Sequence, residues 1–113
     1  MKLDSRTQSD AETLKKLDLD IWGKETGNAD PSCMFPALHA RWLLANNKDF
    51  QERGKKFVHN APYILLNLAG LDSSDAFVDW GTMSGWGLGY RVYQKEWSDE
   101  QLAILGIKLK QML

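Results

Sequence analysis

The segment from Trp80 to Trp97 reads Trp-Gly-Thr-Met-Ser-Gly-Trp-Gly-Leu-Gly-Tyr-Arg-Val-Tyr-Gln-Lys-Glu-Trp and holds three of the five tryptophans and four of the nine glycines. Glycine permits positive φ angles and close backbone approach, whereas tryptophan and tyrosine supply large rigid surfaces. Leu88, Tyr90 and Val92 alternate with their neighbours at the period of a β-strand. A strand needs a partner for its backbone groups, so we expect a hairpin built around residues 81–87.

Helical patterns flank this segment on both sides. Capping-box sequences begin at Ser9 and Ser98, and Pro36 and Pro62 suit the first turn of a helix. The segment 61–69 is apolar on nearly every side, so we expect that helix to be central. The expected helices cover residues 9–22, 36–46, 49–59, 61–69, 76–80 (a strand being the alternative there) and 98–112. The predicted fold is therefore a single mainly α-helical domain over residues 1–113, with five to six short helices and a small β-hairpin or ribbon near residues 77–94. An α+β fold is the alternative.

Composition narrows the classes of function. The formal net charge is −1, from fourteen basic and fifteen acidic side chains, so nucleic acid is not favoured as a partner. The sequence has neither a signal-peptide pattern nor an apolar run long enough to span a bilayer, and we expect no membrane association. Cys33 is the single cysteine, which excludes an internal disulfide and favours a cytoplasmic location.

No motif predicts catalysis. Residues 85–90 lack the third glycine of a dinucleotide loop, and Ser84 is not midway between glycines as a nucleophile elbow requires. Asp75 and Asp79 would share a helix face as an acid-base pair, although helix capping explains both more simply. The spacing of Cys33, His39 and His59 matches no structural zinc site. We therefore expect no cofactor and no metal, and favour a protein without enzymatic activity.

The aromatic segment predicts a recognition surface, because tryptophan, tyrosine and arginine dominate interface hot spots. The leading hypothesis is a non-enzymatic protein-binding module, such as an inhibitor, an immunity-type protein or an accessory subunit. The simpler alternative is that these rings fill the core, although alternation along a strand would leave at least one ring exposed. The predicted protein-binding residues are Trp86, Tyr90, Arg91, Tyr93 and Trp97. The partner would be another protein or a second copy of the chain in a homodimer.

Two hypotheses from other classes stay open. The same tryptophans would wall a pocket in a small-ligand-binding or enzymatic domain, closed by the loop 81–89 and anchored by Asp79 or His59. A subunit that contacts nucleic acid would use the basic stretch 48–59, in which Phe50 and Phe57 interleave with lysine and arginine.

Overall fold

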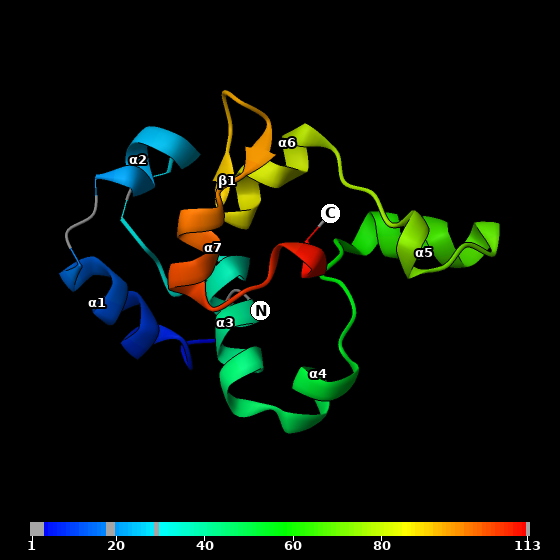
Figure 1. Ribbon diagram of the computed structural model, residues 1–113, viewed down its shortest axis with the longest axis horizontal. Helices are drawn as coiled ribbons and strands as arrows, with labels where there is room; N and C mark the ends of the chain where they lie inside the picture. The colour runs from blue at the N-terminus through cyan, green and yellow to red at the C-terminus, as the bar shows by residue number, and fades with distance from the viewer. Residues whose placement is uncertain (1–3, 18–19, 29, 113) are drawn as a thin grey trace.

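The computed structural model describes residues 4–17, 20–28 and 30–112, with the backbone alone at position 80 (Figure 1). Helices dominate the described residues, and their one sheet is a two-stranded antiparallel hairpin. The α-helices are α1 (Gln8–Lys16), α2 (Ile21–Thr26), α3 (Pro36–Asn46), α4 (Lys48–Arg53), α5 (Asn60–Ala69), α6 (Trp80–Met83) and α7 (Asp99–Leu105). Short 3-10 helices are η1 (Ser73–Asp75), η2 (Ser84–Trp86) and η3 (Leu109–Gln111), and the strands are β1 (Tyr90–Arg91) and β2 (Glu96–Trp97). The prediction of a mainly α fold with a small hairpin is confirmed.

Helix α3 is the centre of the packing. Pro36 occupies its first turn, as predicted, and the helix contacts α1, α4, α7 and η2. Leu38, in the first turn of this helix, is fully buried. Arg41 ties three helices together, because its guanidinium pairs with Asp10 of α1 at 2.9 Å and donates to the Ile104 carbonyl of α7 at 2.8 Å.

The single helix predicted over residues 9–22 is wrong. Helix α1 begins earlier, at Gln8, without a side-chain cap, and ends at Lys16, and a separate helix α2 begins at Ile21. Residues 18 and 19 lie outside the described residues. The separate direction of α2 allows Trp22 to be buried and lets the Glu25 carbonyl accept from the Val92 amide at 2.9 Å. Tertiary packing outweighs the local periodicity here.

Helix α4 stops at Arg53, six residues before the predicted end at residue 59. Asn47 caps its start by accepting from the Phe50 amide at 2.9 Å. Gly54 adopts an extended conformation that ends the helix, and the Phe57 amide donates to the Gln111 carbonyl at 2.9 Å. A pairing between segments this far apart in the chain is invisible to helix periodicity.

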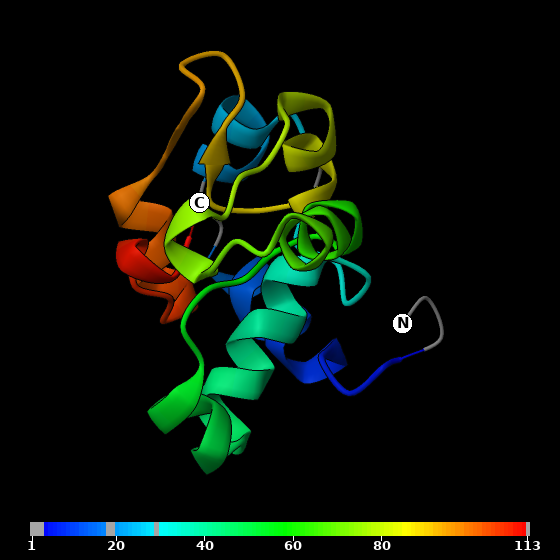
Figure 2. The ribbon, with the colours of Figure 1, turned by 90° about the vertical axis from the view of Figure 1, so that its right-hand side faces the viewer.

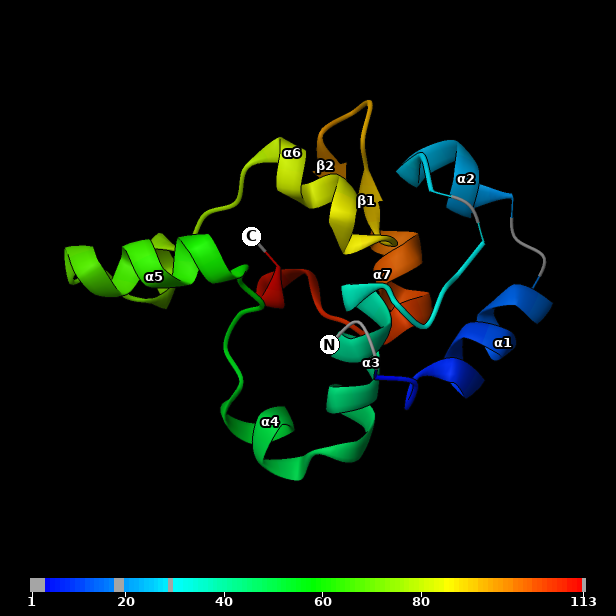
Figure 3. The ribbon, with the colours of Figure 1, turned by 180° about the vertical axis from the view of Figure 1, so that it is seen from behind.

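Helix α5 begins at Asn60, one residue before the predicted start, and ends at Ala69 as predicted, with Gly70 in the left-handed conformation. Its predicted central position is wrong. It projects to one side in Figures 1 and 3 and is seen near its end in Figure 2. Of its large apolar side chains, Leu66 is buried, whereas Tyr63 is 58% and Leu68 80% exposed. The segments 54–59 and 70–79 carry the helix away from α3 instead of laying it across the core.

The segment 76–97 departs most from its prediction. Residues 76–79 are neither helix nor strand, and α6 begins at Trp80 because Asp79 caps it by accepting from the Thr82 amide at 2.8 Å. Residues 81–86 are helical and do not form a hairpin turn. The first strand, Tyr90–Arg91, lies inside the predicted region 77–94, but its partner is the later segment Glu96–Trp97, and Tyr90 pairs with Trp97.

Helix α7 begins as predicted, with the Ser98 side chain accepting from the Gln101 amide. It ends at Leu105, where Gly106 adopts a φ of 72°, so the expected continuation to residue 112 is wrong. Beyond this end, Leu109 is 52% exposed, whereas Met112 is buried.

A buried amide joins α7 to α2 and to the glycine-rich segment. Gln101 is 0% exposed. Its Oε1 accepts from the Gly89 amide at 2.8 Å, and its Nε2 donates to Glu25 Oε2 at 2.7 Å. Because Glu25 also pairs with Arg91 at 3.2 Å, the network fixes the hairpin against α2.

Gly87 is a position that no other residue fits. Its φ is 100°, and a Cβ there would lie 2.3 Å from Cγ of Phe35. We expect Gly87→Ala to lower the free energy of unfolding by about 2 kcal/mol or more, because the substitution adds both backbone strain and overpacking. The matched control is Gly85→Ala, where a Cβ meets no atom within 4 Å. Urea denaturation measures both, and equal losses in the two variants would contradict this account.

Replacing Gln101 by leucine keeps the volume but removes three hydrogen bonds, those with the Gly89 amide, with Glu25 and with the Ile21 carbonyl. The Gly89 amide would stay buried without an acceptor and Glu25 would lose a donor, so we expect a loss of about 2–3 kcal/mol in unfolding free energy. Gln94→Leu, at an exposed position of the hairpin turn, is the control and should change stability by less than about 0.5 kcal/mol. A Gln101 variant as stable as this control would show that the network is dispensable.

Candidate functional site

The five predicted protein-binding residues do not form one exposed surface. Trp86 and Tyr90 are 5% and 8% exposed, and both belong to the core. Trp97 is partly buried against it. Arg91 pairs with Glu25 and Glu96, whereas Tyr93 in the hairpin turn is 81% exposed. The ring expected to be exposed is thus Tyr93, and a contact of this ring with a protein or a second copy stays a prediction.

Trp86 is the centre of an aromatic cluster. Its ring lies 5.7 Å from Phe57 and 6.2 Å from Trp97, and it stacks on the His59 imidazole at 6.1 Å with an interplanar angle of 23°. Tyr90 extends the cluster by an edge-on contact with Trp97 at 5.2 Å. The cluster therefore joins η2, the hairpin and the extended segment before α5.

One side of this cluster opens into a cavity of about 500 Å³. Helix α3, the segment 57–60 and η2 form its walls. The surface is mostly apolar, with a few polar side chains, which is the usual character of a small-molecule site. The lining residues are Met34, Pro36, His39, Ala40, Leu43, Phe57, Val58, His59, Asn60, Gly85 and Trp86. We call it the aromatic cavity.

Three residues of the aromatic cavity carry buried polar atoms that have no hydrogen-bond partner among the described residues. These atoms are Nδ1 of His39, Nε2 of His59 and Nε1 of Trp86. A buried polar atom left unpaired costs about 1–3 kcal/mol, so such atoms are rare and need an explanation. Their gathering around one cavity marks this place as the candidate site.

The proton on His39 can be assigned from its surroundings. Nε2 lies 3.0 Å from the carbonyl oxygen of Cys33, which also accepts from the Thr7 hydroxyl at 2.8 Å. A carbonyl only accepts, so Nε2 carries the proton and Nδ1 of the neutral ring is left as an acceptor. Cys33 therefore orients His39 through its backbone and not through its thiol.

His59 favours its neutral form. Burial lowers the pKa of this imidazole below its ordinary value of 6.5, and the charge of Asp79 opposes the shift in part. The Asp79 carboxylate itself is engaged in capping α6, and hydrogen bonds from the Thr82 hydroxyl and amide lower its pKa. The small-ligand hypothesis named Asp79 and His59 as polar anchors of a pocket. In the structure His59 lines the aromatic cavity, whereas Asp79 caps α6.

The other candidates occupy ordinary structural positions. Asp75 accepts from the Asp72 amide at 3.2 Å within η1, so both members of the expected carboxylate pair are capping residues. In the part of the chain that the structure describes, no three histidine, cysteine, aspartate or glutamate side chains gather as a metal site would require. No helix built from described residues is long and apolar enough to cross a membrane.

Comparison with known families adds what the geometry alone does not. The model of the N-terminal domain of the FGGY family of carbohydrate kinases matches residues 1–113. The chain belongs to this family. A search of curated proteins found no match.

Membership of the FGGY family overturns the leading functional prediction. The prediction of a non-enzymatic binding module, whether an inhibitor, an immunity-type protein or an accessory subunit, is wrong, because the family consists of carbohydrate kinases. The error came from treating the absence of a short catalytic motif as evidence against an enzyme. A domain that contributes the walls of a cavity needs no such motif, since its residues come from distant segments.

Sequence reasoning named Trp86 and His59 but did not join them to α3. The missed residues of the cavity include Met34, Leu43 and Asn60. Their signal in the sequence is slight, because an apolar residue beside a cavity looks like any core residue. The structure itself shows that His39 lies on α3, buried among apolar residues.

The lowered pKa of His59 predicts a pH dependence of stability. The unfolded chain binds a proton at His59 more readily than the folded chain does, so stability should fall as the pH drops below about 6.5. We expect His59→Gln to reduce this acid-side loss, since glutamine does not titrate. Thermal unfolding of both proteins between pH 5 and 8, in steps of about half a unit, measures the difference. Parallel curves for the two proteins would exclude His59 as the titrating group.

Proposed function

We propose that this chain recognises the carbohydrate in a kinase that transfers a phosphoryl group to a sugar hydroxyl. The observation that carries the proposal is the match of residues 1–113 to the N-terminal domain of the FGGY carbohydrate kinases. Phosphoryl transfer depends mainly on positioning and on electrostatic stabilisation of the transferred group. A domain that holds the acceptor sugar in place therefore contributes directly to the rate.

The aromatic cavity supports this proposal through its shape and lining. Its volume of about 500 Å³ lies within the range of small-ligand sites, about 300–1,000 Å³. A sugar ring presents C–H groups on its faces and hydroxyl groups around its edge. The apolar faces of Trp86 and Phe57 suit the C–H groups of the sugar. The polar atoms of the cavity suit its hydroxyl groups.

The protonation states favour a neutral, hydroxyl-bearing ligand. Nδ1 of His39 would accept from a hydroxyl, whereas a neutral His59 supplies one donor and one acceptor. Asn60 lies at the exposed start of α5 and adds an amide with both functions. The buried nitrogen atoms are shielded from solvent, so we propose that the rings rotate slightly as the sugar enters.

Binding of unmodified sugars tests the proposal. Titration with pentoses, hexoses and polyols, followed by tryptophan fluorescence and calorimetry, should identify at least one ligand. Gly85→Leu should weaken its binding by about tenfold or more, because the new side chain would occupy space beside Trp86. Tyr93→Ala, which removes an exposed ring outside the cavity, is the control and should bind normally.

Transfer is tested separately by incubating the bound sugar with ATP and Mg²⁺ and searching for the sugar phosphate by mass spectrometry. A panel in which no sugar binds, or a Gly85→Leu variant that binds as well as the unmodified chain, would contradict the proposed site. A cytoplasmic location fits the single cysteine and stays part of the proposal.

A further inference from the structure

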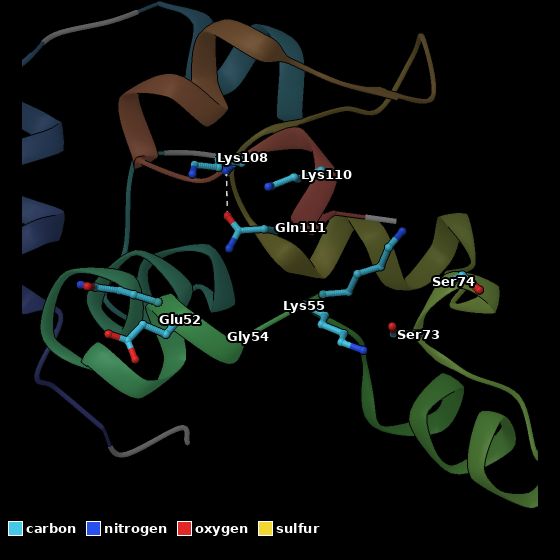
Figure 4. Close-up of a pocket in the computed structure, with 10 residues that line it drawn as sticks. Glu52, Gly54, Lys55, Ser73, Ser74, Lys108, Lys110 and Gln111 are labelled. Carbon is cyan, nitrogen blue, oxygen red and sulfur yellow. Dashed lines mark hydrogen bonds between the residues drawn. The ribbon is translucent and has the colours of Figure 1, made fainter.

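A second hollow, of about 420 Å³, lies between α4, η1 and η3 (Figure 4). It has no lining residue in common with the aromatic cavity. Its walls come from three separate parts of the sequence: the end of α4 with the residues after it, η1, and the C-terminal η3. The lining residues are Gln51, Glu52, Gly54, Lys55, Lys56, Ser73, Ser74, Lys108, Lys110 and Gln111. We call it the lysine hollow.

The lysine hollow concentrates positive charge in a chain whose net charge is −1. Four lysines and one glutamate line it, a local excess of three positive charges. In the described part of the chain, none of these four lysines forms an ion pair with a carboxylate. Lys56 Nζ donates to the Met112 carbonyl at 3.4 Å, and the charges of the other three are available to an incoming anion.

A buried amide adds a fixed donor. Gln111 is only 9% exposed, and its Oε1 is occupied by the Lys108 amide at 3.0 Å. This bond fixes the side chain, and Nε2 has no acceptor among the residues that the structure describes. Figure 4 shows the Nε2 end of Gln111 turned away from Lys108. Unlike the lysines, this donor sits on a side chain held by the fold.

The groups left unoccupied around the hollow are thus mostly donors. Beyond Glu52, a competing carboxylate is that of Asp72, which attracts Lys55. Hydrogen bonds from the Ser74 hydroxyl and amide already engage Asp72 and lower the pKa of its carboxyl. A compact dianion with several acceptor oxygens matches this arrangement better than a neutral molecule does, because charge-assisted hydrogen bonds are the stronger kind.

We propose that the lysine hollow binds the phosphoryl group of a small phosphate or phosphate ester through Lys55, Lys110 and the amide of Gln111. The ammonium groups supply charge and adaptable donors, while Gln111 fixes one oxygen. The site is independent of the carbohydrate proposed for the aromatic cavity. Either site could therefore fail its test without affecting the other.

Calorimetric titration in a phosphate-free buffer tests this site with inorganic phosphate, a hexose 6-phosphate and adenosine monophosphate. The unphosphorylated hexose is the ligand control and should give no heat from this hollow. Equal affinity for the three phosphorylated compounds would identify the phosphoryl group itself as the ligand. Tighter binding of one ester would identify the source of that group. Equal affinity and tighter binding of one ester both support the site, provided that Lys55→Ala/Lys110→Ala and Gln111→Glu weaken the binding.

The double variant Lys55→Ala/Lys110→Ala should weaken binding of these compounds by about tenfold or more, because two charge-assisted contacts are lost. Lys15→Ala/Lys16→Ala removes the same charge from exposed positions of α1 and is the matched control. Gln111→Glu keeps the acceptor for the Lys108 amide and replaces the free donor by a negative oxygen, so it should also weaken binding. Circular dichroism checks that each variant is folded.

Three results would overturn the proposal: no binding of any phosphorylated compound, unchanged binding in both Lys55→Ala/Lys110→Ala and Gln111→Glu, or an equal loss in the α1 control. The last would mean that only the overall charge of the chain attracts phosphate. Raising the salt concentration should weaken the binding as well, since the lysines are exposed and screened by ions.

Discussion

The arrangement of the hairpin, α2 and α7 depends on the buried side chain of Gln101. One amide group there holds the glycine-rich segment through the Gly89 nitrogen and α2 through Glu25. Glu25 in turn receives Arg91 and, through its carbonyl, the Val92 amide. A two-residue strand pair has few hydrogen bonds of its own, so this short hairpin is fixed mainly by polar contacts to the neighbouring helices. The aromatic cluster takes its geometry from the same constraint, because Trp97 lies in the second strand.

The parts of the fold that the sequence predicted are those governed by local chemistry. Pro36, Gly70 and Ser98 each mark a helix end that the structure confirms, because their effects act within a few residues. The wrong predictions concern helix ends that are determined by contacts with distant segments of the chain. Helix α4 ends early so that Phe57 can pair with Gln111, and α2 turns so that Trp22 is buried. Neither partner could be identified from periodicity.

The candidate site follows the same rule. Trp86 and His59 stood out in the sequence because of their residue types, yet the cavity arises from their position opposite α3. The glycines beside Trp86 also proved to have different roles. Gly87 accommodates the Phe35 ring against the backbone, whereas Gly85 borders open space at the cavity. The lysine hollow could not be predicted, since its lysines come from the segment after α4 and from the start of η3, more than fifty residues apart in the chain.

Because α5 projects from the rest of the fold, its local unfolding free energy differs from that of the core helices. The helix is joined to the rest by two segments without regular strands or long helices, and most of its large side chains already face water. Opening it would expose little further apolar surface, so its local unfolding free energy is far below that of α3 or α7. The backbone amides of α5 therefore exchange hydrogen with solvent through this local opening, while those of α3 exchange only when the whole core unfolds. His59 and Asn60, at the start of α5, lie at the boundary between the part that opens locally and the part that opens only when the core unfolds.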